Sequence, residues 1–148
     1  MSNETISIEL KQRENYHFSA EFGAGIPALS CDEPVPLGTG LGPSPVQLLA
    51  AAVANCLSDS LLFALRKYKQ APEPLSCRVS AEVGRNEAGY VRVLAMQAQL
   101  QLGVPAAQLQ HLERVLETFE KYCTVTQSVG QGIPISVQVS DSLGQRLK

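Results

Sequence analysis

Hydrophobic and polar residues alternate along the first part of the chain. Ile6, Ile8 and Leu10 are separated by polar residues, and a similar alternation returns over residues 16–22. A period of two is typical of a strand with one buried face, and the polar stretch 12–15 between the two segments predicts a hairpin turn. We therefore expect a β-hairpin in this part of the chain.

A long apolar helix should follow a connection rich in glycine and proline, residues 23–45. Ser44 suits the helix N-cap, a proline occupies the first helical position, and Gln47 stands where a capping box requires it. The helix should run to about Tyr68, because two prolines follow closely. Residues 48–65 are apolar on nearly every side, so we expect both a sheet and a second subunit to cover them.

The second half of the chain predicts three more strands and two more helical segments. In chain order we expect strands over 75–83 and 90–102, a helix over 105–122, a short helical turn over 124–129 and a strand over 134–140. The resulting order, β-β-α-β-β-α-α-β, predicts an α+β fold with antiparallel sheets. No repeat or linker interrupts it, so residues 1–148 are expected to form a single domain.

Composition and charge narrow the possible partners. Hydrophobic residues make up 45% of the 148 residues, and the net charge of -2 gives no basic surface for nucleic acid. The first residues are polar and do not resemble a signal peptide. The longest apolar run, 48–57, is interrupted by Asn55 and is too short to cross a bilayer. We expect a soluble cytoplasmic protein that binds neither nucleic acid nor membrane.

Four cysteines are the candidates for chemistry: Cys31, Cys56, Cys77 and Cys123. A reducing compartment argues against a structural disulfide framework. The cysteines lack the close spacings of zinc ligands and the two histidines are isolated, so we expect neither a metal nor a cofactor. Cys77 alternates with core residues of a predicted strand, which favours packing, and Cys31 in the loop is expected to be a bystander.

Cys56 and Cys123 allow two interpretations each. Cys56 lies on the apolar helix among four polar residues (Asn55, Ser58, Asp59 and Ser60), which favours a functional thiol as much as a small core residue. Cys123 precedes a predicted helical turn, whose dipole would favour a thiolate, although it also suits a packing position. Spacing along the chain cannot pair the two.

Two motifs resemble those of the OsmC/Ohr family: GPSPVQLLAAAVANCL at 42–57 and FEKYCTVT at 119–126. The resemblance covers essentially the whole chain. It implies an intertwined α+β homodimer, with antiparallel sheets packed around central helices and active sites at the subunit interface. It also implies thiol-dependent reduction of organic hydroperoxides. In that reaction Cys56 would form a sulfenic acid, Cys123 would close a disulfide with it, and a dithiol reductant would restore both.

The chain departs from the hydroperoxide-reducing members at specific positions. Val46 stands where those members carry a glutamate, and Thr124 replaces a proline. Arg13, in the first predicted hairpin turn, would be the arginine that stabilises the Cys56 thiolate. Glu33 or Asp32 would supply the missing carboxylate, unless Asp32 caps a local turn and Glu33 is solvated. The pattern is similar to a less characterised branch of the family that shares the glycine- and proline-rich loop.

The sequence is also compatible with three other functions. The protein could be a non-catalytic dimer that binds a small hydrophobic molecule, a disulfide-exchange protein, or a structural dimer whose cysteines only pack in the core.

Overall fold

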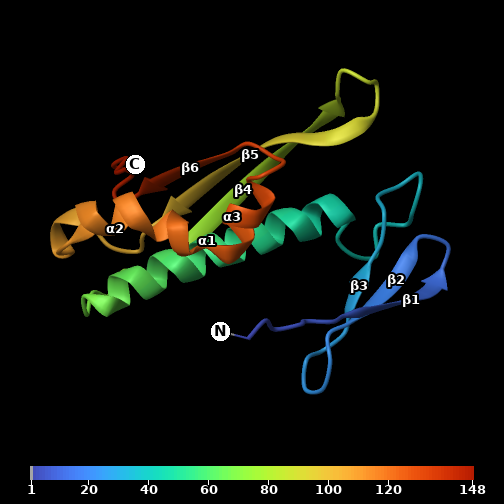
Figure 1. The fold of residues 1–148 in the computed structure, drawn as a ribbon, viewed down its shortest axis with the longest axis horizontal. Coiled ribbons are helices and arrows are strands. Elements are labelled where there is room, and N and C mark those ends of the chain that lie inside the picture. Colours follow the sequence, from blue (N-terminus) through green and yellow to red (C-terminus); the bar gives the residue numbers. More distant parts are fainter. Residues whose placement is uncertain (1) are drawn as a thin grey trace. The chain divides into compact units, whose positions relative to one another are not determined.

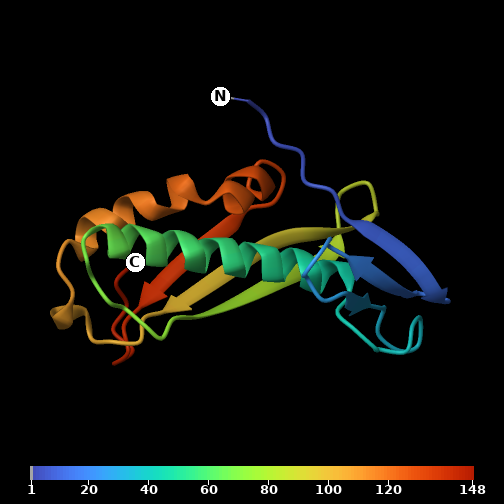
Figure 2. The ribbon, with the colours of Figure 1, turned by 90° about the horizontal axis from the view of Figure 1, so that it is seen from below.

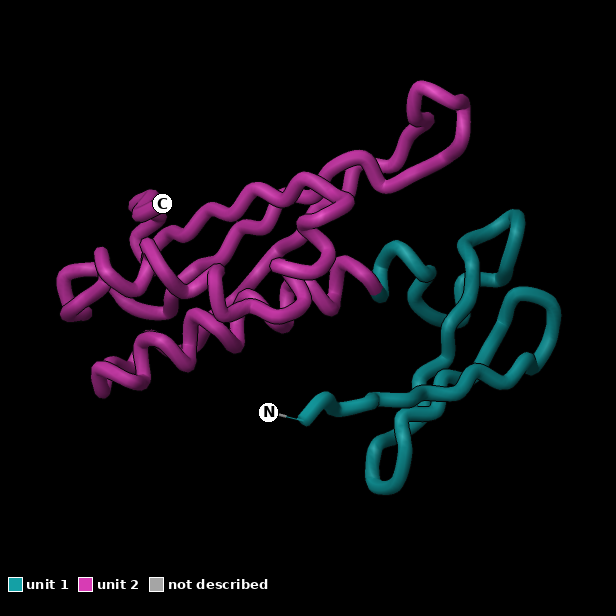
Figure 3. Tube along the Cα trace, in the orientation of Figure 1, with its two compact units in different colours: residues 1–48 teal, residues 49–148 magenta. Residues whose placement is uncertain are grey.

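The computed structural model describes residues 2–148 and combines helices with two small sheets (Figure 1). The elements in chain order are β1 (Glu9–Glu14), β2 (His17–Glu21), β3 (Leu29–Cys31), α1 (Pro45–Lys67), β4 (Ser76–Arg85), β5 (Val91–Gln101), η1 (Ala106–Gln108), α2 (Leu112–Thr118), η2 (Phe119–Tyr122), α3 (Thr124–Val129) and β6 (Ile135–Ser140). The chain divides into two compact units, one up to Leu48 and one from Leu49 onward (Figure 3). The predicted mixture of α and β elements is confirmed.

The first unit contains the antiparallel sheet β1-β2-β3. The predicted hairpin exists, but its first strand begins later than expected and runs through the residues predicted as the turn. The chain reverses at Asn15, which adopts a left-handed φ of 52°; asparagine tolerates this conformation better than most residues. Gln12 pairs with Phe18 and Glu14 with His17, so the register shifts at the intervening residue.

The glycine- and proline-rich connection contains a strand that the sequence did not predict. β3 is three residues long and pairs with β2, with Cys31 opposite Phe18. A strand this short carries too few residues for a period of two to stand out. The expected irregular loop is therefore divided by an ordered segment.

α1 begins with the predicted capping box. The Ser44 backbone N–H donates to Gln47 Oε1 at 2.9 Å, and the Gln47 N–H donates to Ser44 Oγ at 3.3 Å. These bonds satisfy N–H groups that have no partner within the helix. The buried residues of α1 recur every four positions and form one stripe: Val53, Leu57, Leu61 and Leu65.

The second unit is built on the sheet β4-β5-β6, and α1 crosses one face of it with α2 and α3 alongside (Figures 1 and 2). The buried stripe of α1 packs with Met96, Ala98 and Leu100 of β5, Phe119 of η2 and Val139 of β6. β4 and β5 are antiparallel, as predicted, but β6 runs parallel to β5. The long connection through α2 and α3 allows this parallel return, which a short hairpin does not.

The helix predicted over 105–122 is broken into three pieces. η1 ends at Gln108, the next residue Leu109 is extended, and His111 adopts a left-handed φ of 61° before α2 begins. The last four residues form the tighter 3₁₀ turn η2. Leu116 and Phe119, two of the apolar residues in this range, are buried, but apolar spacing does not reveal where the backbone leaves the helix.

α1 ends at Lys67, one residue before the predicted end at Tyr68. The whole helix of 23 residues is long and apolar enough to cross a membrane by length and composition alone, whereas the run 48–57 is only part of it. Core helices of globular proteins meet the same criterion. The buried stripe of α1 is part of the core of the second unit, which is the environment that the structure shows for it.

Candidate functional site

Two free thiols from distant parts of the sequence meet inside the second unit. Cys56 lies in the middle of α1, at the edge of its buried stripe, and is partly exposed. Cys123 lies between η2 and α3 and is fully buried in the core. The Cys56 side chain lies near enough to Cys123 to raise the pKa of the Cys123 thiol. The structure therefore brings together two residues that sequence spacing could not pair.

The surroundings of Cys123 favour its neutral thiol form. Burial raises the pKa of Cys123 above its ordinary value of 9.0, and the neighbouring Cys56 raises it further. The hydroxyl and backbone N–H of Thr126 act in the opposite direction but do not outweigh burial. The prediction that a helix dipole makes this thiol anionic is wrong, because α3 has only six residues and desolvation dominates.

Thr126 is a site residue that the sequence reasoning missed. The Cys123 Sγ–H donates to Thr126 Oγ1 at 2.8 Å, and the threonine is buried. When the thiol loses its proton, the hydroxyl can rotate and donate its own hydrogen to the sulfur. The available signal was the spacing of three residues across a helix start, which is the spacing between an N-cap and the N3 position.

The polar residues beside Cys56 separate into different environments. Asn55 and Asp59 are exposed, whereas Ser58 is partly buried and its Oγ donates to the Ala54 carbonyl at 2.7 Å. Burial raises the pKa of the Cys77 thiol, and the nearby Ser58 partly offsets the rise. Cys77 packs against the core from β4, as predicted.

Arg13 and Val46 lie in the first unit. Arg13 belongs to β1, where the register shifts, and not to a hairpin turn as predicted. Its side chain is exposed and forms no ion pair with any residue in the range 2–148. Val46 is the second residue of α1 and is half-buried. The role of Arg13 beside Cys56 stays a prediction.

Asp32 organises its own loop. Its buried carboxylate accepts hydrogen bonds from the Thr39 hydroxyl at 2.7 Å and from the backbone N–H groups of Glu33, Thr39 and Leu41. These bonds, led by the one from the Thr39 hydroxyl, lower the pKa of Asp32 to about 2. Of the two alternatives for Asp32, the structure supports the cap of a local turn.

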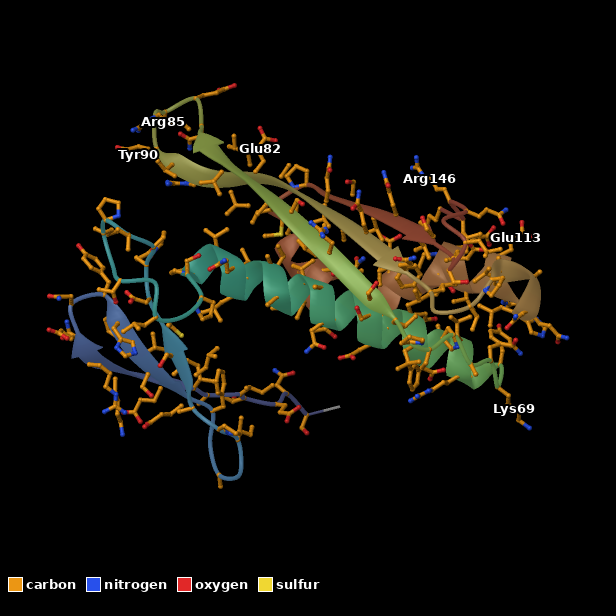
Figure 4. All side chains as sticks on the ribbon, turned by 180° about the vertical axis from the view of Figure 1, so that it is seen from behind. Lys69, Glu82, Arg85, Tyr90, Glu113 and Arg146 are labelled. Atoms are coloured by element: carbon orange, nitrogen blue, oxygen red, sulfur yellow. The ribbon has the colours of Figure 1, made fainter. Side chains whose placement is uncertain are left out.

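Two arginines of the second unit contact partners other than the thiols. Arg66 pairs with Glu73 at 2.6 Å, and Arg85 donates to the Gly89 carbonyl at 2.6 Å. Figure 4 shows Lys69 at the end of α1 and Arg85 at the tip of the β4–β5 hairpin. Within residues 2–148, no three His, Cys, Asp or Glu side chains gather as a metal site would require. The candidate site therefore consists of the Cys56 and Cys123 thiols and the Thr126 hydroxyl.

Comparison with known proteins identifies the family. The family model for OsmC-like proteins matches residues 38–138, which include Cys56 and Cys123. No curated protein sequence matches the chain. Among solved structures, an OsmC-like protein of unknown function from Vibrio cholerae is 18% identical, with a TM-score of 0.78 over 93% of this chain and 99% of that one.

Two further structures share this fold. An organic hydroperoxide resistance protein from Elizabethkingia anophelis is 15% identical, with a TM-score of 0.74 over 95% of this chain and 99% of that one. The organic hydroperoxide resistance protein OhrB of Bacillus subtilis is 12% identical, with a TM-score of 0.69 over 92% and 98%. At such low identity these structures show only that the fold is shared. The family match covers more than half of the sequence and includes both cysteines. The chain belongs to the OsmC-like protein family.

Proposed function

We propose that this protein is a thiol-dependent redox protein that reduces organic hydroperoxides through Cys56 and Cys123. The observation that carries the proposal is the pair of neighbouring free thiols, one partly exposed and one buried. Family membership supports it, because two similar structures are organic hydroperoxide resistance proteins. The four free cysteines suit a reducing compartment, and we expect the protein in the cytoplasm.

The first step assigns Cys56 as the attacking thiol. Cys56 is the more accessible member of the pair, so a peroxide can reach its sulfur while Cys123 stays covered. The Cys56 thiolate attacks the terminal peroxide oxygen, the O–O bond breaks, and the other oxygen leaves as the alcohol after taking a proton. Cys56 is thereby oxidised to a sulfenic acid, and the hydroperoxide is reduced to an alcohol.

The second step uses the buried thiol. The Cys123 sulfur attacks the Cys56 sulfur, an S–S bond forms, and the sulfenic oxygen leaves as water with the proton of Cys123. The raised pKa keeps that proton on Cys123 until the sulfenic acid forms, and Thr126 is placed to stabilise the sulfur as the proton leaves. A small dithiol then reduces the disulfide by two exchange reactions and becomes a disulfide itself.

The thiolate of Cys56 needs a stabilising cation, and we assign this role to Arg13. Arg13 is exposed and unpaired among the described residues, so its guanidinium is available. Val46 provides no carboxylate that would hold the guanidinium, and Asp32 is already engaged in its loop. The expected consequence is a slower first step than in a site with an arginine fixed by a carboxylate.

The functional form is proposed to be a homodimer. Several residues of α1 outside the buried stripe are exposed, including Ala51, Ala52 and Phe63, and Phe63 is 64% exposed. The first unit also exposes Ile6 and Ile26. Several large apolar side chains exposed on one protein are typical of an interface with another protein. A second copy of the chain would cover them.

Turnover tests the function directly. The purified protein, supplied with cumene hydroperoxide and excess dithiothreitol, is expected to consume the peroxide in the steady state. The variants Cys56→Ser and Cys123→Ser should lose this activity, whereas Cys77→Ser should keep it because Cys77 packs elsewhere in the core. The competing function, binding of a small hydrophobic molecule without turnover, predicts no consumption above the rate of dithiothreitol alone.

A further inference from the structure

A lysine far along the sequence contacts the turn that carries Cys123. The Lys148 Nζ forms an ion pair with Glu120 of η2 and donates to the Leu116 carbonyl of α2 at 2.8 Å. It also lies 5.3 Å from the ring centroid of Phe119. One cation therefore contacts the end of α2 and the first two residues of η2.

Glu120 connects this cation to the buried thiol. Its backbone carbonyl accepts a hydrogen bond from the Cys123 N–H at 3.1 Å and another from the Gln127 side-chain amide at 3.1 Å. The same residue thus holds Lys148 through its carboxylate and Cys123 through its carbonyl. A displacement of Glu120 would move the backbone of Cys123.

The other end of the lysine is fixed to the sheet. The Lys148 N–H donates to the Val139 carbonyl at 3.2 Å, and the Val139 N–H donates to the Lys148 carbonyl at 3.2 Å. Val139 belongs to β6 and is fully buried. The lysine side chain therefore links the rigid sheet to the short turn that precedes Cys123.

We propose that Lys148 is a positioning residue that holds η2 so that the Cys123 sulfur faces Cys56. A disulfide requires a narrow range of β-carbon separations and dihedral angles, so a small movement of one cysteine lowers the chance of bond formation. η2 is four residues long, and Phe119 is its only buried residue. The contribution of the ion pair to global stability is small, because both side chains are partly exposed, at 33% and 26%.

The proposal concerns the geometry of the pair, and it rests on the proposed function only for its use in peroxide turnover. The test measures the Cys56–Cys123 equilibrium in a glutathione redox buffer, which needs no peroxide. Lys148→Met should lower the effective concentration of the pair by about tenfold, the size expected for a modest misplacement of reacting groups. Lys148→Arg should restore it. Arg66→Met, which removes an exposed ion pair elsewhere in the same unit, should leave it unchanged.

Three outcomes would overturn the positioning role. These are a Lys148→Met equilibrium equal to that of the wild type, no rescue by Lys148→Arg, or the same loss in Arg66→Met. A wild-type protein that forms no Cys56–Cys123 disulfide in the buffer would end both proposals. A further outcome is a protein that consumes no hydroperoxide while its Cys56–Cys123 equilibrium in the buffer still depends on Lys148. That result would end the proposed function and leave the positioning role supported.

Discussion

At the scale of single residues, Cys123 shows how burial and local bonds compete. Burial and Cys56 raise its pKa, and Thr126 partly offsets the rise. A thiol held neutral in this way is a poor nucleophile toward solvent reagents. It becomes useful when an electrophilic sulfur is formed next to it, because attack then requires no diffusion.

Thr126→Val tests the role of the hydroxyl. The substitution keeps the shape of the side chain and removes the group that lowers the pKa of Cys123, so that pKa should rise further. Closure of the disulfide after oxidation should slow by about tenfold, which corresponds to a hydrogen bond of about 1.4 kcal/mol. Stopped-flow measurement of the two oxidation steps checks this.

The control for this prediction is Thr124→Val, because Thr124 is exposed on the same short helix. The first oxidation step should be unchanged in both variants. Closure at the wild-type rate in Thr126→Val would show that the hydroxyl does not assist Cys123.

The sequence predicted the two cysteines of the site but not their surroundings. Cys56 and Cys123 stood out through their motifs and polar company, whereas Thr126 gains its role only when α3 places its hydroxyl on the thiol. The helix-dipole prediction for Cys123 failed because burial cannot be read from a residue that lies between two short helical segments. The chemistry of Cys123 thus depends on how the chain packs around its thiol.

At the scale of elements, caps were predictable and backbone reversals were not. The capping box of α1 follows from Ser44 and Gln47 alone, and the structure contains both of its hydrogen bonds. The shift of β1 and the break before α2 depend on the left-handed φ angles of Asn15 and His111. Neither residue forces that conformation, so an amphipathic pattern continues through it unnoticed.

The loop held by Asp32 gives a pH-dependent prediction. Because the pKa of Asp32 is lowered from 3.8 to about 2, its contribution to stability is fully present above pH 3.8 and is lost as the pH falls through about 2. Asp32→Asn should therefore be less stable than the wild type at pH 7, and the difference should shrink as the pH falls from 4 toward 2.

Urea unfolding followed by circular dichroism at a series of pH values measures this difference. Glu33→Gln is the matched control, since Glu33 lies next to Asp32 but its carboxylate does not bind the donors of the loop. A stability difference for Asp32→Asn that does not change with pH would contradict the assigned role.

At the scale of the whole molecule, the exposed apolar surface predicts a dimer. The mass of the wild-type protein in solution, measured by light scattering after gel filtration, should be twice that of one 15.9 kDa chain. Phe63→Asp, on the exposed side of α1, should weaken association by at least tenfold, because a charge would be buried without a partner.

Leu143→Asp is the control for the dimer, because Leu143 is 77% exposed but does not lie on α1. It should leave the mass unchanged. A wild-type protein that stays monomeric at micromolar concentration would contradict the dimer and leave the apolar surface without an explanation.

The sequence predicted the fold class and the proximity of two distant cysteines. The α+β order followed from the change between periods of two and of 3.6, and the pairing of Cys56 with Cys123 followed from the resemblance to a family. The parallel pairing of β6 was missed, because strand direction depends on how the connection through α2 and α3 crosses the sheet. Periodicity along the chain carries no such information.

The most direct test of the account is peptide mapping by mass spectrometry after oxidation with one equivalent of cumene hydroperoxide. We expect loss of two thiols per chain and a single new disulfide that joins Cys56 to Cys123, with Cys31 and Cys77 still reduced. A disulfide that joins any other pair, or a Cys56 that stays reduced while the peroxide persists, would contradict it.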